Sequence, residues 1–308
     1  MIISSGVKTS CAGRQAAVGV KEHWRERNSL DASGRDGGVS LRTWTVWGMY
    51  LPDAIARYAA PDGRLYLLTA NEGDTRAWTG FNGEARVSEL RLDPRNYPSA
   101  QELQRDGEMG RLRVTNAQGD EDGDGDYDVL YMFGARSFSV WTADVDQVYD
   151  SGNDFEVVSA LNPTASFNVS STDNALDSRS DDKGPEPEAV ALGTVRGKPY
   201  VFIGNERQSN ILVYDLTEPR NPRYLGQFSN RNPQAATSTP NAGDLGPEGV
   251  ILVVADRLTA VGQADDRPRH EGGDTTVSGP DDPSRAPAEA FHRAAPCHAC
   301  LSQCCRCE

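Results

Sequence analysis

Histidine and cysteine are missing from most of this chain of 308 residues. No histidine occurs between residues 24 and 269, and no cysteine occurs between residues 12 and 296. The middle therefore cannot carry a Ser-His-Asp triad, a histidine-bound zinc ion or an internal disulfide framework. A metal held there must be bound by oxygen atoms, which are the ligands that calcium and magnesium prefer.

Long apolar runs and positive charge are also scarce. No stretch approaches the roughly 18 apolar residues that a membrane-spanning helix needs, so we expect no transmembrane segment. Residues 1–20 lack the apolar centre of a signal peptide. The formal net charge of −14 disfavours nucleic acid as a partner, because binding to phosphates needs basic surfaces.

The two ends of the chain differ in composition from its middle. Residues 257–308 contain no Ile, Met, Lys, Asn, Tyr or Trp but hold five of the six cysteines. Because the missing residues mostly have AT-rich codons, one interpretation is an out-of-frame translation of a GC-rich gene. The alternative is a disordered linker that ends in a small Cys/His metal site. We therefore divide the chain into an atypical, disordered start (1–19), a β domain (20–256) and a disordered, frameshifted tail (257–308).

Short strand-like runs dominate the middle of the sequence. They are rich in β-branched and aromatic residues and are separated by Gly, Pro, Asn and Asp. Helical periodicity is almost absent, and only residues 99–106 and 144–149 are modest helix candidates. The expected strands cover residues 65–69, 85–90, 128–133, 138–141, 155–158, 200–203, 211–214 and 250–253.

A motif of proline, acid, small residue and β-branched residue recurs at 52–55, 187–190 and 247–250. After each of the first two copies comes a strand that ends in Asn-Glu. Residues 187–228 then divide into four strands, which is the size of one propeller blade, and residues 112–161 form a second candidate blade. A β-sandwich would also have short strands but would not explain the recurring motif. The sequence thus predicts an all-β fold, an incomplete β-propeller of about three to four four-stranded blades.

The densest acidic segment lies between Gly119 and Asp128. Its aspartates follow the spacing of the first half of an EF-hand loop, and Gly125 permits the sharp turn around the ion. The twelfth position of such a loop is Tyr131 instead of the usual glutamate, so the pattern indicates a calcium loop that leads into a strand. The alternative is an acidic turn without an ion. The predicted calcium ligands are Asp120, Asp122, Asp124, Asp126 and Asp128.

The acids of the repeated motif form a second candidate metal site. In a propeller, the first strand of each blade lines the central channel, so these acids would face one another there. A ring of carboxylates on a channel can bind calcium. The alternative is that each acid caps backbone N–H groups at a turn. The channel candidates are Asp53, Glu188 and Glu248, with Glu72, Asp74 and Glu206 at the rim.

Cationic side chains beside the acidic motifs are candidates for holding a phosphate group. Phosphoester hydrolysis would need them together with metal ions that activate water. Arg136, Arg179 and Arg207 are the candidates, although arginines in such positions more often form structural ion pairs. No Gly-x-Ser-x-Gly motif occurs, so any hydrolytic activity would depend on metal held by carboxylates.

Long, specific motifs lie at residues 30–38, 48–55, 69–74, 133–141, 173–188 and 238–249. They resemble the choice-of-anchor I family, and the resemblance covers about residues 20–256. This family is similar to mesenchyme-specific cell-surface glycoproteins, and its bacterial members are often labelled alkaline phosphatases. The resemblance implies a secreted or surface-anchored β-propeller.

The sequence therefore favours an extracellular, calcium-binding β-propeller domain that acts in surface attachment, scaffolding or mineral association. Its cofactor would be Ca²⁺, and its partner a mineral or cell-surface ligand. One alternative is a calcium-dependent phosphoesterase, alkaline phosphatase-like or phytase-like, which would act on a phosphoester. A second alternative is a truncated fragment without a function of its own.

Overall fold

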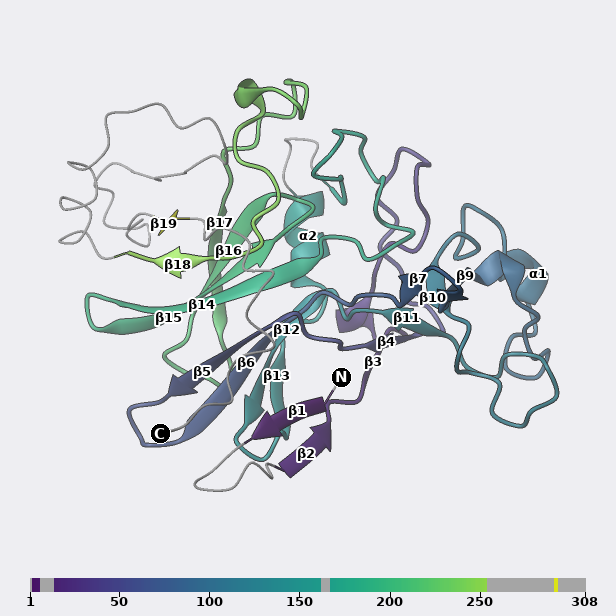
Figure 1. Cartoon of the computed structure of the whole chain (residues 1–308), viewed down its shortest axis with the longest axis horizontal. Helices are drawn as coiled ribbons and strands as arrows, with labels where there is room; N and C mark the ends of the chain where they lie inside the picture. The colour runs from purple at the N-terminus through teal and green to yellow at the C-terminus, as the bar shows by residue number, and fades with distance from the viewer. Residues whose placement is uncertain (1, 6–13, 162–166, 254–290, 293–308) are drawn as a thin grey trace.

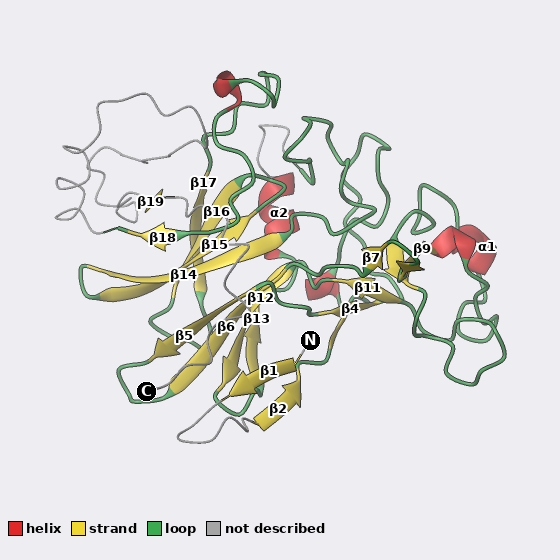
Figure 2. Cartoon of the chain, in the orientation of Figure 1, coloured by secondary structure: helices red, strands yellow, loops and turns green. Residues whose placement is uncertain are grey.

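The computed structural model describes residues 2–5, 14–161, 167–253 and 291–292. Strands and loops make up most of these residues, and the helices are short (Figure 2). The described residues form three larger sheets, two with four strands and one with five. The all-β prediction is confirmed. Within these residues, none of the helices has the length and apolar character needed to cross a membrane.

The first four-stranded sheet is antiparallel throughout and has the strand order β13-β12-β6-β5 (Figure 1). Strands β5 and β6 form a hairpin. Strands β12 and β13 join the sheet only after a long excursion of the chain. The strands are β5 (Ala54–Ala59), β6 (Leu65–Asn71), β12 (Ser137–Thr142) and β13 (Gln147–Asp150).

The second four-stranded sheet has its strands in chain order and confirms the four strands predicted within residues 187–228. It repeats the layout of the first sheet, because Ala54 pairs with Ala70 just as Ala189 pairs with Gly204. The strands are β14 (Pro187–Val195), β15 (Lys198–Asn205), β16 (Asn210–Asp215) and β17 (Arg223–Phe228).

The five-stranded sheet has the order β3-β4-β11-β10-β9, and its central pair, β4 and β11, is parallel. Three of its strands come from the long segment that separates β6 from β12, so this segment is an insertion in the first four-stranded sheet. The strands are β3 (Val20–Glu22), β4 (Trp47–Met49), β9 (Glu84–Arg86), β10 (Arg113–Thr115) and β11 (Tyr131–Phe133).

Shorter elements complete the described residues. Three strand pairs, β1–β2, β7–β8 and β18–β19, lie outside the larger sheets. The strands are β1 (Ile2–Ser5), β2 (Arg14–Ala17), β7 (Ala77–Trp78), β8 (Phe81–Asn82), β18 (Ile251–Leu252) and β19 (Phe291–His292). The helices are α1 (Ala100–Leu103), α2 (Asp154–Ala160) and the 3₁₀ turns η1 (Glu26–Asn28), η2 (Val87–Glu89) and η3 (Pro240–Ala242).

Two large apolar clusters form most of the core. One is shared by the two four-stranded sheets and joins Leu68 and Phe138 of the first sheet to Ile203 and Leu212 of the second. The other lies around the five-stranded sheet and includes Leu112, Val114 and Met132. The two repeated sheets therefore share one interior, whereas the insertion packs with residues 30–46 around a second one.

The predicted strand at 155–158 is wrong, because these residues lie in helix α2. A run of four residues with three apolar members fits either a strand or a buried helix. Here the helix places Phe155 and Ser159 on one buried face, and the Ser159 hydroxyl donates to the carbonyl of Phe155 at 2.7 Å. The predicted helix at 144–149 is also wrong, because a turn with Val145 at φ 69° leads directly into β13.

The second candidate blade at 112–161 is wrong as a unit. Its strands divide between two sheets, because β10 and β11 join the five-stranded sheet and β12 pairs with β6, far back in the chain. The expected strands at 85–90 and 128–133 are shortened to β9 and β11, and the helix candidate at 99–106 contains α1. Of the predicted start (1–19), residues 2–5 and 14–17 form the paired strands β1 and β2, and of the predicted tail (257–308) all but residues 291–292 lie outside the described residues.

Candidate metal centre

The repeat brings acidic side chains together where the two four-stranded sheets meet. Strand β14 packs against β5 and β6, so the acidic ends of these strands adjoin. Glu72 directly follows β6, Glu206 directly follows β15, and Glu186 directly precedes β14. Carboxylate oxygens of these three residues lie within 4.8 Å of one another. This spacing is close enough for one divalent cation to contact all three.

Glu186 is the best-buried member of this carboxylate cluster, with none of its surface exposed. Lys183 Nζ lies 3.0 Å and Arg207 Nε 3.2 Å from its Oε2 oxygen, and Arg179 pairs with its Oε1 oxygen. Burial opposes ionisation of Glu186, but these three cations outweigh it and lower its pKa to about 2. Glu186 is therefore a permanent anion. Its backbone also has φ 53°, in the left-handed region.

The pKa values of Glu188 and Glu72 are raised, whereas that of Glu186 is lowered. Burial, reinforced by the charges of Glu72, Glu206 and Asp53, raises the pKa of Glu188 to about 9. Burial also raises the pKa of Glu72 to about 8, even though Lys183 pairs with it. Without a further cation, the cluster therefore holds protons at neutral pH.

The six acids predicted for the channel and rim lie close enough to influence one another. Burial and the charges of Asp74 and Glu248 raise the pKa of Asp53, and Asp53 in turn raises that of Glu188. Glu206 joins them through a hydrogen bond with Glu188 and a 3.0 Å ion pair with Arg207. Of the six, Glu72 and Glu206 have carboxylate oxygens within 4.8 Å of each other.

Sequence reasoning missed Glu186 and Lys183, which lie at the centre of the cluster. Both belong to the segment 183–188, in which prolines alternate with glutamates. Only Glu188 matches the repeated motif, so Glu186 had no counterpart in the first repeat that would have drawn attention to it. The available signal was the pairing of a lysine with two closely spaced glutamates, which is common on protein surfaces.

The three predicted phosphate-binding arginines differ in their placement. Arg179 and Arg207 lie at the carboxylate cluster, where both pair with Glu186. Arg136 is 2% exposed and pairs with a different carboxylate. Its guanidinium pairs with buried Glu156 at 2.7 Å and donates to the backbone carbonyls of Asp31, Ser180 and Asp182. Arg136 therefore ties segments of the fold together instead of facing a ligand.

The acidic loop forms a second group of carboxylates in the insertion. Oxygens of Asp120, Asp122 and Asp124 lie within 4.8 Å of one another, and all three side chains are exposed. Asp126 instead forms a 3.2 Å ion pair with Arg91, and Asp128 accepts the backbone N–H of Glu121 at 2.8 Å. Three of the five predicted ligands are thus close together, whereas Asp126 and Asp128 lie outside this group.

Comparisons with known proteins place the chain in a family. A family model described as the choice-of-anchor I domain matches residues 8–219. Gigasin-3a of Magallana gigas is 39% identical over 129 residues, which are 40% of this chain and 44% of that protein. The mesenchyme-specific cell surface glycoprotein of Strongylocentrotus purpuratus is 27% identical over 233 residues, 65% of this chain and 30% of that protein.

The chain thus spans less than half the length of either relative. No solved structure matches it. The family model nevertheless covers both of the four-stranded sheets up to β16, together with the insertion and its acidic loop. The chain belongs to the choice-of-anchor I family.

Proposed function

We propose that this chain is an extracellular, surface-associated module that binds calcium and acts in attachment, scaffolding or mineral association. The observation that carries the proposal is the convergence of Glu72, Glu186 and Glu206 within 4.8 Å where the repeated sheets meet. The surface location draws on the family and on the relative named as a mesenchyme-specific cell surface glycoprotein.

The proposed architecture is a β-propeller to which the described sheets contribute. Two equivalent four-stranded sheets, each with its strands in the order of a meander, have the form of blades. Their first strands, β5 and β14, lie beside each other, and β14 also contacts β18, which follows the third copy of the motif. This arrangement supports a radial array in which the first strands line a common axis.

The charge of the carboxylate cluster supports one divalent ion there. The cluster contains five carboxylates, which are those of the three converging glutamates, Glu188 and Asp53. It contains three cationic groups, Lys183, Arg179 and Arg207. The cluster therefore has an excess of at least two negative charges when fully ionised, before Asp74 and Glu248 are counted. A calcium ion would balance this excess and would supply the positive charge that protons otherwise provide. Glu72, Glu186, Glu188 and Glu206 are the residues that would hold it.

The exposed aspartates of the insertion support a second, weaker calcium site. Asp120 accepts the backbone N–H groups of Gly123 at 2.7 Å and Gly125 at 3.1 Å, which folds the loop back on itself. Both glycines have positive φ, 79° and 90°, which a side chain would disfavour. Asp120, Asp122 and Asp124 would be its ligands, and affinities of about 10⁻⁴–10⁻³ M are typical of extracellular modules.

The phosphoesterase alternative has less support from the geometry. A phosphate would need arginine donors that are free to bind it. Arg179 and Arg207 both hydrogen-bond with Glu186, and Arg136 is buried against Glu156. A calcium-binding function does not require these arginines to leave their partners.

Calcium titration of the chelator-treated full chain by isothermal calorimetry tests the proposal. We expect two sites, and we expect Glu206→Gln to remove the site at the carboxylate cluster and Asp122→Asn to remove the site in the acidic loop. Glu218→Gln, at an exposed position outside both groups, is the matched control and should keep both sites. Absence of binding at about 1 mM calcium, the weak end of extracellular sites, would refute the proposal.

A further inference from the structure

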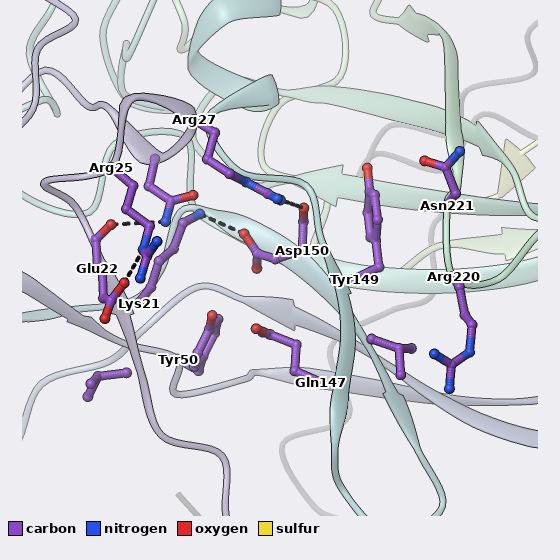
Figure 3. Close-up of a pocket in the computed structure, with 13 residues that line it drawn as sticks. Lys21, Glu22, Arg25, Arg27, Tyr50, Gln147, Tyr149, Asp150, Arg220 and Asn221 are labelled. Atoms are coloured by element: carbon purple, nitrogen blue, oxygen red, sulfur yellow. Dashed lines mark hydrogen bonds and ion pairs between the residues drawn. The ribbon is translucent and has the colours of Figure 1, made fainter.

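An open pocket lies where all three larger sheets approach one another, away from both groups of carboxylates. Its cavity volume is about 630 Å³, within the range of small-molecule sites. Strand β3 and turn η1 form one side, β13 lies across from them, and the turn between β16 and β17 contributes Arg220 and Asn221 (Figure 3). The pocket is therefore built from segments far apart in the sequence.

The charge of this pocket is opposite to that of the whole chain. Four cationic side chains and two carboxylates line it, although the chain has a formal net charge of −14. The cationic residues are Lys21, Arg25, Arg27 and Arg220, and the acidic residues are Glu22 and Asp150.

Both carboxylates already have protein partners. Asp150 lies 3.0 Å from Lys21 Nζ and accepts hydrogen bonds from the hydroxyls of Ser137 and Ser139 at 2.8 and 2.7 Å. Glu22 pairs with Arg25. Within the described residues, neither Arg27 nor Arg220 forms an ion pair with a carboxylate. Their positive charges are therefore not neutralised by the acids of the pocket.

Arg27 and Lys21 are held in place by the backbone. The guanidinium of Arg27 donates to the carbonyl of Asp150 at 2.7 Å, which directs this exposed side chain toward the pocket (Figure 3). Lys21 is 3% exposed and donates to the carbonyls of Ala135 and Gly152 at 2.9 and 2.6 Å. With Asp150 as the third acceptor, all three N–H donors of Lys21 are used, so Lys21 contributes charge to the pocket. The fixed position of Arg27 reduces the entropy that would be lost on binding a ligand.

The remaining lining is aromatic and amide-bearing. Tyr50 is 5% exposed and packs edge-on against Trp141 with ring centroids 5.3 Å apart, and Tyr149 contacts Phe138. Burial raises the pKa of both tyrosine hydroxyls, so they stay protonated and can donate. Together with the amides of Gln147 and Asn221, they offer donors and acceptors suited to a hydroxyl-rich ligand.

We propose that this pocket binds an acidic saccharide unit, in which a carboxylate or sulfate group pairs with Arg27 or Arg220 and the sugar hydroxyls contact the tyrosines and amides. Arginine suits such planar or oxygen-rich anions because its guanidinium offers several donors in a fixed geometry. This site is separate from the proposed calcium sites and does not depend on them.

Isothermal calorimetry on the full chain at constant ionic strength tests this assignment. The probes are glucuronate, glucose 6-sulfate, neutral glucose and sodium sulfate. We expect at least one of the two acidic sugars to bind at a single site, and the pair to show whether carboxylate or sulfate is preferred. Glucose and sodium sulfate should each bind at least about tenfold more weakly, since each lacks one half of the contacts.

Variants locate the binding. Arg27→Gln and Arg220→Gln should each weaken the preferred acidic sugar, the stronger effect being about tenfold, as expected for loss of a charge-assisted hydrogen bond. Arg57→Gln removes one exposed arginine on β5, outside the pocket, and should leave the affinity unchanged. Equal weakening by all three variants, equally tight binding of sodium sulfate, or no binding of either acidic sugar at about 10 mM would overturn the proposal.

Discussion

Glu186 shows how a single side chain can decide both charge and stability at the carboxylate cluster. It is fully buried and pairs with Lys183, Arg179 and Arg207, so its removal leaves three partly buried cations without their common partner. We expect Glu186→Gln to lower the free energy of unfolding by about 3–5 kcal/mol. Urea denaturation with chelator present measures this loss, and Glu218→Gln, at an exposed site, should change it by less than about 0.5 kcal/mol. A loss below about 1 kcal/mol in Glu186→Gln would contradict the arrangement.

Asp177 contributes to the pH dependence of stability. Its side chain is fully buried, its Oδ2 accepts the N–H of Asp36 at 3.2 Å, and within the described residues its Oδ1 has no hydrogen-bond partner. Burial, reinforced by the charge of Asp31, raises its pKa to about 7. The folded state therefore holds a proton that the unfolded state, with a pKa of about 3.9, has already released. Stability from this group falls as pH rises from about 4 to 7, by at most about 1.4 kcal/mol per pH unit.

Asp177→Asn should remove that dependence, because an amide resembles the protonated carboxyl group and does not titrate. We expect the stability of Asp177→Asn relative to the unmodified chain to increase from pH 5 to pH 7.5 and then to level off. Urea denaturation across this range measures the difference. A difference that does not vary with pH would show that Asp177 is ionised throughout. Asp62→Asn, in an exposed turn, serves as the control.

At the scale of elements, one ion pair attaches helix α2 to the beginning of β12. Arg136 directly precedes β12, and Glu156 lies in α2. We expect Glu156→Gln to lower the free energy of unfolding by about 3 kcal/mol, since it leaves a buried guanidinium uncompensated. Arg136→Met should cost more, about 4–5 kcal/mol, because three backbone carbonyls also lose their donor.

A double-mutant cycle with Arg136→Met and Glu156→Leu separates the ion pair from these backbone contacts. The double variant should be less destabilised than the sum of the two single variants, because it leaves no unpaired buried charge. Additive losses would show that the two residues act independently. Thermal or urea unfolding of the four proteins provides the measurement.

The elements also show why some of the fold could be predicted from the sequence and some could not. The repeated Pro-acid motif and the Asn-Glu strand ends predicted the equivalence of Asp53 with Glu188 and of Glu72 with Glu206, because each pair occupies the same register position. The pairing of β12 with β6 was not predictable in this way, because the insertion separates their sequences. Helix α2 was mistaken for a strand because its apolar run is too short to show a period.

At the scale of the whole molecule, the two core clusters predict two cooperative units. Leu212 lies in the cluster shared by the two four-stranded sheets, and Met132 lies in the cluster of the insertion; both side chains are fully buried. Leu212→Ala should lower the free energy of unfolding by about 2–5 kcal/mol. It should reduce amide exchange protection in β6 as much as in β15, although β6 belongs to the other sheet. Met132→Ala should reduce protection mainly in β4, β10 and β11.

Loss of protection confined to β14–β17 in Leu212→Ala would instead show that each sheet unfolds alone. The shared interior favours the first outcome, because removing one side of that apolar cluster exposes the other to water.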